Sequence, residues 1–326
     1  MTTSPILASS RTARGLTLDQ VWVAAALILL ALRPLLTPIP PHDFWWHLAT
    51  GRLMVQQGHI PAVDTFSFTR AGEPFFNQSW LAQLLMYGLF SAGGLPLVLI
   101  AQALVVVVAY GLLLRLCILR TGRTRLSVAL LLLTTMPLSF DNWTVRPQTY
   151  AFPLFVAMLT ILTEFRLKRS NRLWLLPVLM AAWVNIHGSF VLGIALIGIT
   201  FVGEWLQAFR PEPGSRRSPV VSRRFVLWGI GAGLATLLNP TGIGVLGYVR
   251  NLLGSSQVTN LVTEWAPPTT RDIGGIIFFL FVIITVLAMV YGRRRPGLTD
   301  LLLFLAFFWL ALGAVRNIVW FGFVAT

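Results

Sequence analysis

Short polar clusters interrupt an otherwise apolar sequence and contain the side chains that could do chemistry. The candidates are carboxylates, arginines, histidines and amides: Asp43, His47, Glu73, Arg146, Gln148, Asn185, His187, Glu264, Arg316 and Asn317. A carboxylate within hydrogen-bond reach of a hydroxyl can accept its proton, and fixed guanidinium groups bind phosphate oxygens. The clusters therefore predict a site where a carboxylate and several arginines act together.

The composition indicates the surroundings of these clusters. The chain has 326 residues, of which 56% are hydrophobic and 11% are charged. Soluble proteins average about 25% charged residues, and the mean hydropathy here is +0.75. These values exclude an ordinary cytosolic enzyme and a disordered protein, and they indicate a polytopic membrane protein. The single cysteine, Cys117, excludes an intrachain disulfide and a cysteine metal cluster.

Apolar segments of helical length divide the chain, and we expect an all-α fold with about nine to ten transmembrane helices. The predicted spans are 21–36, 95–119, 126–140, 148–165, 173–184, 190–209, 225–238, 273–291, 301–315 and the short segment 318–326. The last segment reaches only about 14 Å of the roughly 30 Å hydrocarbon layer, so we expect a truncated C-terminus or a partial helix. Residues 1–19 are expected to form a cytoplasmic tail, and residues 20–326 a single transmembrane domain.

Basic residues alternate along the chain as a membrane topology requires. Eighteen fall on one side, in clusters at 11–14, 115–125, 166–172, 210–224 and 293–295, and six fall on the other side. Because cytoplasmic loops are enriched in Lys and Arg, we expect a multi-pass protein of the inner (plasma) membrane with a cytoplasmic N-terminus. The net charge of +14 then reports orientation. Membrane lipids are expected as partners, and nucleic acid is not.

The predicted helices differ in length with direction. The spans that leave the cytoplasm near residues 126, 173 and 225 have fewer apolar residues than the spans that return. Short helices end below the outer surface, and polar groups at that depth are tolerated only inside protein or beside water. Because the polar clusters follow these short spans, we expect a polar cavity in the outer half of the membrane.

The first external loop, residues 40–79, is the longest of the external connections. Apolar residues at helical spacing predict two interfacial helices, at 44–57 inside the loop and at 79–90 after it. Gly93 and Gly94 are expected to separate the second helix from the next span.

The motifs of this loop follow a recognisable order. Asp43 comes just after the first span, Gly58-His59-Ile60-Pro61 follows an amphipathic helix, and Gly72-Glu73-Pro74 precedes a Trp-Leu helix. This order resembles the GT-C superfamily of membrane glycosyltransferases, and the protein O-mannosyltransferase and aminoarabinose transferase branch is the most similar. Over about residues 20–326, the chain also resembles a poorly characterised bacterial group of that superfamily. The segments that carry this second resemblance are 43–52, 146–148, 183–188, 239–242 and 316–317.

The resemblance implies a GT-C-like fold and a glycosyltransferase that moves a sugar from a polyprenyl-phosphate donor to an unspecified acceptor on the external face. Asp43 would be the catalytic base or would position the acceptor. Arg146 and Arg316, with Arg33 as a further candidate, would bind the lipid phosphate. The donor would be a substrate, and the resemblance implies no separate cofactor with certainty.

Two positions depart from the superfamily pattern. Gln78-Ser79 stands where relatives usually have a His-Glu pair, and Phe44 follows Asp43 where mannosyltransferases have a second acid. A second carboxylate is therefore missing at both places. Glu73 and Glu264 are the candidates to supply it.

Other interpretations of the same residues stay open. Asp43 could be a helix N-cap, and Asn185 and His187 could satisfy helix ends. Asp43 and His47 offer two ligands to a divalent metal, which are too few to define a metal site. At the level of function, the alternatives are a transporter or lipid flippase and a non-catalytic membrane subunit of a complex.

Overall fold

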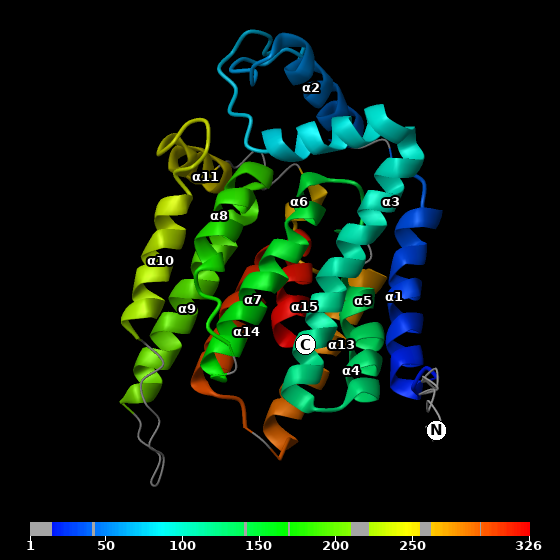
Figure 1. The fold of residues 1–326 in the computed structure, drawn as a ribbon, viewed down its shortest axis with the longest axis vertical. Helices are drawn as coiled ribbons and strands as arrows, with labels where there is room; N and C mark the ends of the chain where they lie inside the picture. The colour runs from blue at the N-terminus through cyan, green and yellow to red at the C-terminus, as the bar shows by residue number, and fades with distance from the viewer. Residues whose placement is uncertain are drawn as a thin grey trace, which may run out of the picture.

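The computed structural model describes residues 15–40, 43–139, 142–168, 170–209, 222–254, 262–293 and 295–326. Most of the expected N-terminal tail and the basic segment 210–221 lie outside these ranges. Figure 1 shows a bundle of helices with shorter helices laid across one end. We call this end, where α2 (Asp43–Gln57) lies, the α2 end, and the other, where α1 (Leu18–Leu36) begins, the opposite end.

The helices follow the apolar segments of the sequence. After α1 and α2 come α3 (Trp80–Thr121), α4 (Thr124–Leu130), η1 (Leu131–Thr135), α5 (Met136–Ser139), α6 (Pro147–Tyr150), α7 (Phe152–Arg166), α8 (Leu175–Ile186), η3 (Gly188–Phe190), α9 (Val191–Ala208), α10 (Arg223–Ala235), α11 (Gly244–Gly254), η4 (Thr263–Trp265), α13 (Ile273–Tyr291), α14 (Leu298–Gly313), η5 (Val315–Asn317) and α15 (Ile318–Ala325). In the described ranges, β-structure is limited to one isolated bridge between Val63 and Pro74. The expected all-α class is thus confirmed for this part of the chain.

Several helices have the length and composition of membrane spans. Five described segments are long and apolar enough to cross a membrane: Leu18–Leu36, Trp80–Thr121, Pro147–Arg166, Gly188–Ala208 and Ile273–Tyr291. The apolar helices Leu175–Ile186, Leu298–Gly313 and Val315–Ala325 are shorter. These are the features of an all-α membrane protein, while the expected nine to ten spans stay a prediction.

The lengths of neighbouring helices differ as the sequence predicts. α8 has 12 residues and α10 has 13, whereas α9 has 18 and α13 has 19. At about 1.5 Å per residue, the shorter helices leave room at one end of the bundle. The polar turns that follow α8 and α10 lie at the α2 end.

A sharp break divides α3 into two parts. Gly94 has φ +64° and ψ −160°, a conformation open to glycine and strongly disfavoured for other residues. The part before the break lies across the α2 end, and the part after it descends through the bundle (Figure 1). The expected boundary at Gly93 and Gly94 is therefore correct.

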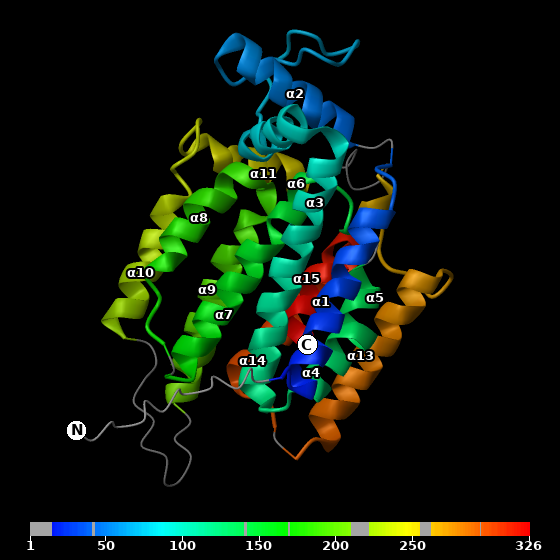
Figure 2. The same ribbon diagram turned by 45° about the vertical axis from the view of Figure 1, so that its right-hand side comes forward.

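The core of the bundle is aromatic and surrounds the last helix. Six consecutive residues of α15, from Ile318 to Phe323, are buried. Trp320 packs edge-to-face on Phe152 of α7, with ring centroids 5.1 Å apart. Figures 1 and 2 both place α15 inside the bundle. Burial on this scale stabilises a helix that would be too short to persist alone in water.

Ion pairs join the helices at the opposite end. Arg166 of α7 contacts Glu204 of α9 at 2.6 Å and Asp300 of α14 at 2.9 Å. Arg120 of α3 reaches the same Asp300 at 3.0 Å. Some of the arginines that predict orientation therefore also connect four helices.

The contact between α9 and α14 gives a test of the packing. At Gly203, an added Cβ would lie 2.6 Å from Oγ1 and 2.7 Å from Cα of Thr299. Gly203→Ala is expected to force the two helices apart and to lower the free energy of unfolding by about 1–3 kcal/mol. The measurement is the thermal unfolding midpoint of the purified protein in detergent.

Gly198→Ala is the matched control, because a Cβ at Gly198 of the same helix meets no atom within 4 Å. Its midpoint should stay the same or rise, since Ala is a better helix former than Gly. Equal losses in the two variants would contradict the close approach of α9 to α14.

Candidate functional site

A cavity of about 470 Å³ lies at the α2 end of the bundle. Its walls contain eight of the ten residues that the sequence singles out: Asp43, His47, Arg146, Gln148, His187, Glu264, Arg316 and Asn317. They come from α2, the start of α6, the turn between α8 and α9, and the segments η4 and η5. The fold thus gathers polar clusters that are far apart in the sequence around one space.

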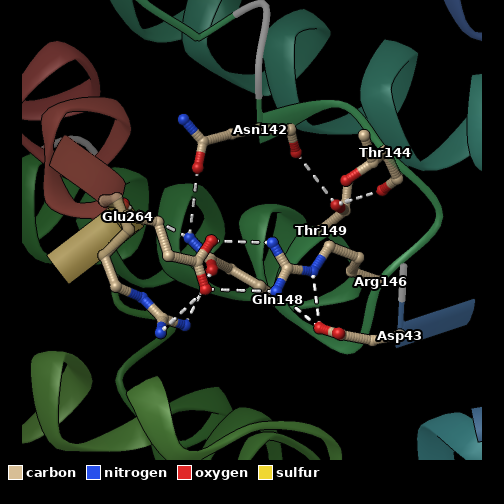
Figure 3. A network of polar contacts seen from close by, with 8 residues as sticks. Asp43, Asn142, Thr144, Arg146, Gln148, Thr149 and Glu264 are labelled. Atoms are coloured by element: carbon tan, nitrogen blue, oxygen red, sulfur yellow. Dashed lines mark hydrogen bonds and ion pairs between the residues drawn. The ribbon is translucent and has the colours of Figure 1, made fainter. Parts of the chain in front are cut away.

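The guanidinium of Arg146 joins two carboxylates (Figure 3). Its Nη2 lies 2.5 Å from Oδ2 of Asp43, and its Nε lies 3.1 Å from the same oxygen. Its Nη1 and Nη2 donate to Oε2 and Oε1 of Glu264 at 2.8 and 3.1 Å. Both contacts with Asp43 end on Oδ2, so Arg146 does not use Oδ1.

Arg316 forms the second cationic group of the site. Its Nη1 lies 3.4 Å from Oε1 of Glu264, and its Nη2 donates to Oε1 of Gln148 at 3.0 Å. The guanidinium carbon lies 4.7 Å from the ring centroid of Trp265, within the range of a cation–π contact. Asn317 donates to the carbonyl of Leu310 at 3.2 Å, which ties η5 to α14. Arg316 is therefore held on three sides.

The loop before α6 is shaped by hydrogen bonds to its backbone. Oγ1 of Thr149 donates to the carbonyls of Asn142 and Thr144 at 3.0 and 2.8 Å (Figure 3). Nε2 of Gln102 in α3 donates to the carbonyls of Trp143 and Thr144 at 3.0 and 3.1 Å. These bonds present Arg146 at the N-cap position of α6, directly before Pro147.

His47 is a buried, neutral member of the cavity wall. Its side chain faces Gln83 of α3, with Nδ1 3.1 Å from Nε2, and Gln83 accepts from Asn77 at 2.8 Å. Burial, opposed by Asp43 and reinforced by Arg146, lowers the pKa of His47 to about 4. The imidazole is therefore uncharged at neutral pH.

His187 stands at the break between α8 and α9. Its Nδ1 accepts from the backbone N–H of Ser189 at 3.1 Å and lies 2.8 Å from Oγ of Ser189. That hydroxyl also accepts from Nε1 of Trp183 at 3.1 Å. The side chain thus caps η3, as the structural interpretation expects, and it also lines the cavity.

Among the described residues, the charges of the site are balanced. Burial disfavours the ionised form of Glu264, but the hydrogen bonds from Arg146 and the charge of Arg316 outweigh burial and hold the pKa of Glu264 below its usual value. Two carboxylates thus face two guanidiniums. An anionic ligand would have to compete with Asp43 or Glu264 for Arg146.

Glu73 and Asn185 are the two candidates outside this cavity. Glu73 is exposed on the long loop and pairs with Arg70 at 2.6 Å. Asn185 accepts from Nε1 of Trp80 and donates to the carbonyls of Ala181 and Leu238. It faces a neighbouring cavity of about 210 Å³, and its contacts fit the helix-end interpretation.

An apolar wall, which the polar clusters do not reveal, completes the cavity. Its members come from α9, α11 and α14: Val191, Leu192, Tyr248, Val249 and Leu310. Tyr248 stacks on Phe76 of the long loop, with ring centroids 4.8 Å apart. The amphipathic sequence of α11 is the feature from which this wall could have been predicted. The segment lies between two predicted spans, so the sequence analysis did not assign it to a helix.

A divalent metal site at Asp43 and His47 would need at least one further ligand from a neighbouring side chain. Among the described residues, no three side chains of His, Cys, Asp or Glu gather as metal ligands. His42 and Asp141 lie outside that part of the chain.

No protein-family model, curated protein or solved structure matches the sequence or fold of this chain.

Removing Arg146 tests the balance of charge. Arg146→Gln leaves Asp43 and Glu264 without their shared partner, so the free energy of unfolding at neutral pH is expected to fall by about 1–3 kcal/mol. Because pairing lowers the pKa of Glu264, its stabilisation is present above the unfolded-state pKa, about 4.3. It is lost as the pH falls through the lower folded-state pKa. The difference in thermal midpoint between wild type and variant should therefore shrink in acid.

Arg70→Gln is the control, since the pair of Arg70 with Glu73 is exposed and such pairs contribute little. A difference between wild type and Arg146→Gln that stays constant from neutral to acid pH would refute the electrostatic explanation.

Proposed function

We propose that this protein is a membrane glycosyltransferase that transfers a sugar from a polyprenyl-phosphate donor to a hydroxyl acceptor. One observation supports this proposal above all others. A carboxylate, Asp43, and two guanidiniums, Arg146 and Arg316, line the same cavity, whose other wall is apolar. The GT-C-like fold and motifs suggested by the sequence are consistent with this chemistry.

The charges match the demands of the reaction. The acceptor O–H bond breaks as its oxygen attacks the anomeric carbon, and the proton passes to Asp43. The bond between the anomeric carbon and the phosphate oxygen breaks, and its electron pair stays on the phosphate. One negative charge is thus lost at Asp43 while one is gained on the lipid phosphate.

Arg146 is placed to exchange its contact with Asp43 for a contact with the phosphate as these charges change. It contacts Asp43 only through Oδ2, so Oδ1 is available to receive a proton. Once Asp43 is neutral, Arg146 interacts with it less strongly and can bind the phosphate. Arg316, already oriented by Gln148 and Trp265, offers the phosphate a second cation.

The two walls of the cavity suit an amphiphilic donor. The phosphate and sugar would face Arg146 and Arg316, and the first isoprene units would face Val191, Leu192 and Leu310. Burial and the charges of Arg316 and Arg146 lower the pKa of His187 as well, so His47 and His187 add hydrogen-bonding groups without adding charge. Volumes of about 300–1,000 Å³ are usual for small-ligand sites, and this cavity falls within that range.

The membrane topology belongs to the same proposal. We place the α2 end at the external face and the N-terminus in the cytoplasm, with nine to ten spans in the plasma membrane. The arginine-rich segments then lie on the cytoplasmic side, as expected for membrane proteins.

Asp43→Asn tests the catalytic role. Purified protein in vesicles receives undecaprenyl phosphate carrying labelled mannose, glucose or galactose, together with a membrane extract as the source of acceptor. With whichever donor the wild type uses, the variant should transfer label about 100-fold more slowly or worse, while its thermal midpoint falls by less than that of Arg146→Gln, because Arg146 keeps its contact with Glu264. Transfer at the wild-type rate would overturn the role of Asp43.

Asp272→Asn is the matched control. Asp272 caps α13 through its contact with the backbone N–H of Gly275, and Asn is an equally good N-cap. This variant should keep wild-type transfer. Movement of intact labelled donor between leaflets, without any transfer by the wild type, would instead favour a transporter.

A further inference from the structure

A cavity of about 210 Å³ lies at the α2 end, beside the cavity of about 470 Å³ described above. We call the two the smaller and the larger cavity. The wall of the smaller one comes from the long loop (60–62 and 75–78), the start of α3, the end of α8 and the turn after α10. Segments 78–79 and 185–188 contribute residues to both walls, so a ligand in the smaller cavity would lie next to the proposed reaction site.

The wall of the smaller cavity is polar without being charged. Among its described residues, none has an ionisable side chain, whereas the larger cavity is lined by two carboxylates and two guanidiniums. The polar side chains are four amides and one hydroxyl: Asn77, Gln78, Asn185, Asn239 and Thr241. An ion in such a space would lose water without meeting a counter-charge. The wall therefore favours a neutral ligand with polar groups of its own.

Two of the amides have their N–H groups engaged and their oxygens free. Nδ2 of Asn77 donates to Oε1 of Gln83 at 2.8 Å, and Nε2 of Gln78 donates to the carbonyl of Val184. Both Asn77 and Gln78 are more than nine-tenths buried. Within the described part of the chain, no donor reaches Oδ1 of Asn77 or Oε1 of Gln78. A flipped Gln78 amide would oppose its oxygen to the Val184 carbonyl, so the donors to these oxygens must come from the cavity.

Aromatic rings form the apolar part of the same wall, which includes Phe75, Phe76 and Trp80. Nε1 of Trp80 donates to Oδ1 of Asn185 at 2.8 Å, and Asn185 is itself tied to two backbone carbonyls. The indole is therefore held in place at the edge of the cavity. A fixed ring offers a ligand an apolar contact surface at little cost in conformational entropy.

We propose that the smaller cavity binds a neutral saccharide ring. Its hydroxyls would donate to Oδ1 of Asn77 and Oε1 of Gln78, and its C–H face would pack on Trp80 and Phe75. A saccharide combines hydroxyl donors with an apolar face and needs no counter-charge, which is the chemistry of this wall. The volume also far exceeds the roughly 30 Å³ that one water takes in the liquid. Assigning the ring to the donor or the acceptor rests on the proposed function, whereas the binding itself does not.

Saturation-transfer NMR provides the test. The full-length protein in phosphatidylcholine nanodiscs, free of sugar-based detergent, receives the methyl glycosides of mannose, glucose and galactose in turn. Saturation of the aromatic protons of wild type should reach the C–H protons of at least one glycoside, and titration gives its Kd. A wild type that binds none of the three would overturn the inference.

Gln78→Met removes the amide oxygen at similar side-chain length, and it should raise the Kd about tenfold. The variant also loses the donor to Val184, so Gln102→Met is the matched control. Gln102 is a buried glutamine that likewise donates to backbone carbonyls, but it does not line the smaller cavity. Gln102→Met should lower the thermal midpoint at least as much and leave the Kd unchanged.

Ala62→Phe tests the space itself without removing a hydrogen-bonding side chain. Ala62 lines the smaller cavity, and a phenyl ring there should raise the Kd at least about tenfold. Ala71→Phe is its control, because Ala71 is exposed on the same loop and lies outside the walls of both cavities. Unchanged affinity in both Gln78→Met and Ala62→Phe would overturn the inference.

Competition distinguishes the two sources of the saccharide. Displacement of the glycoside by undecaprenyl-phosphate sugar, but not by undecaprenyl phosphate, would support the sugar of the donor. Binding that neither lipid displaces would support the sugar of an acceptor. Displacement by undecaprenyl phosphate alone would place the glycoside in the larger cavity and overturn the inference. Glycoside binding by a wild type that transfers no label would leave this inference standing and refute the proposed function.

Discussion

The arrangement of side chains at the α2 end depends on one guanidinium, that of Arg146, which is shared by two carboxylates. Arg146 contacts Asp43 of α2 and Glu264 of η4, two carboxylates that would otherwise repel each other in a partly buried space. By holding both, it links the long loop region to the segment before α13. It also lines both the larger cavity and another of about 330 Å³ beside the end of α1. An anion that binds Arg146 from either space would therefore compete with these two carboxylates.

The architecture explains how a polar group of this kind is accommodated in an apolar bundle. α8 and α10 are short, and α15 is buried in the aromatic core. The turns at their ends bring irregular backbone to one level of the bundle, where polar groups can satisfy one another. At the opposite end, ion pairs such as that of Arg166 with Glu204 join the helices directly. Rigid packing below thus supports a cavity above.

Much of the cavity could be predicted from the sequence because charged residues are scarce in this chain. An ionisable residue among apolar segments needs a partner or water, so Asp43, Arg146, Glu264 and Arg316 had to come together or face solvent. The break at Gly94 could also be predicted, because a pair of adjacent glycines is a strong local indication of a turn.

Other parts could not be predicted from residue type alone. Glu73 finds a partner three residues away in Arg70, so its charge requires no distant contact. Asn185 has its amide taken by backbone carbonyls and Trp80. The apolar wall around Tyr248 depends on tertiary packing, and so does the smaller cavity, whose Asn77 resembles any polar residue of a loop.

A cryo-EM map would show whether the larger cavity holds a lipid phosphate between Arg146 and Arg316, as we propose. The full-length protein would be imaged in nanodiscs with undecaprenyl phosphate. We expect phosphate density within hydrogen-bond distance of both guanidiniums, with the first isoprene units against Val191 and Leu310. An empty cavity in a map that resolves these side chains would contradict the proposed binding site. A phosphate that lies elsewhere, with the contact of Arg146 with Asp43 unchanged, would contradict it as well.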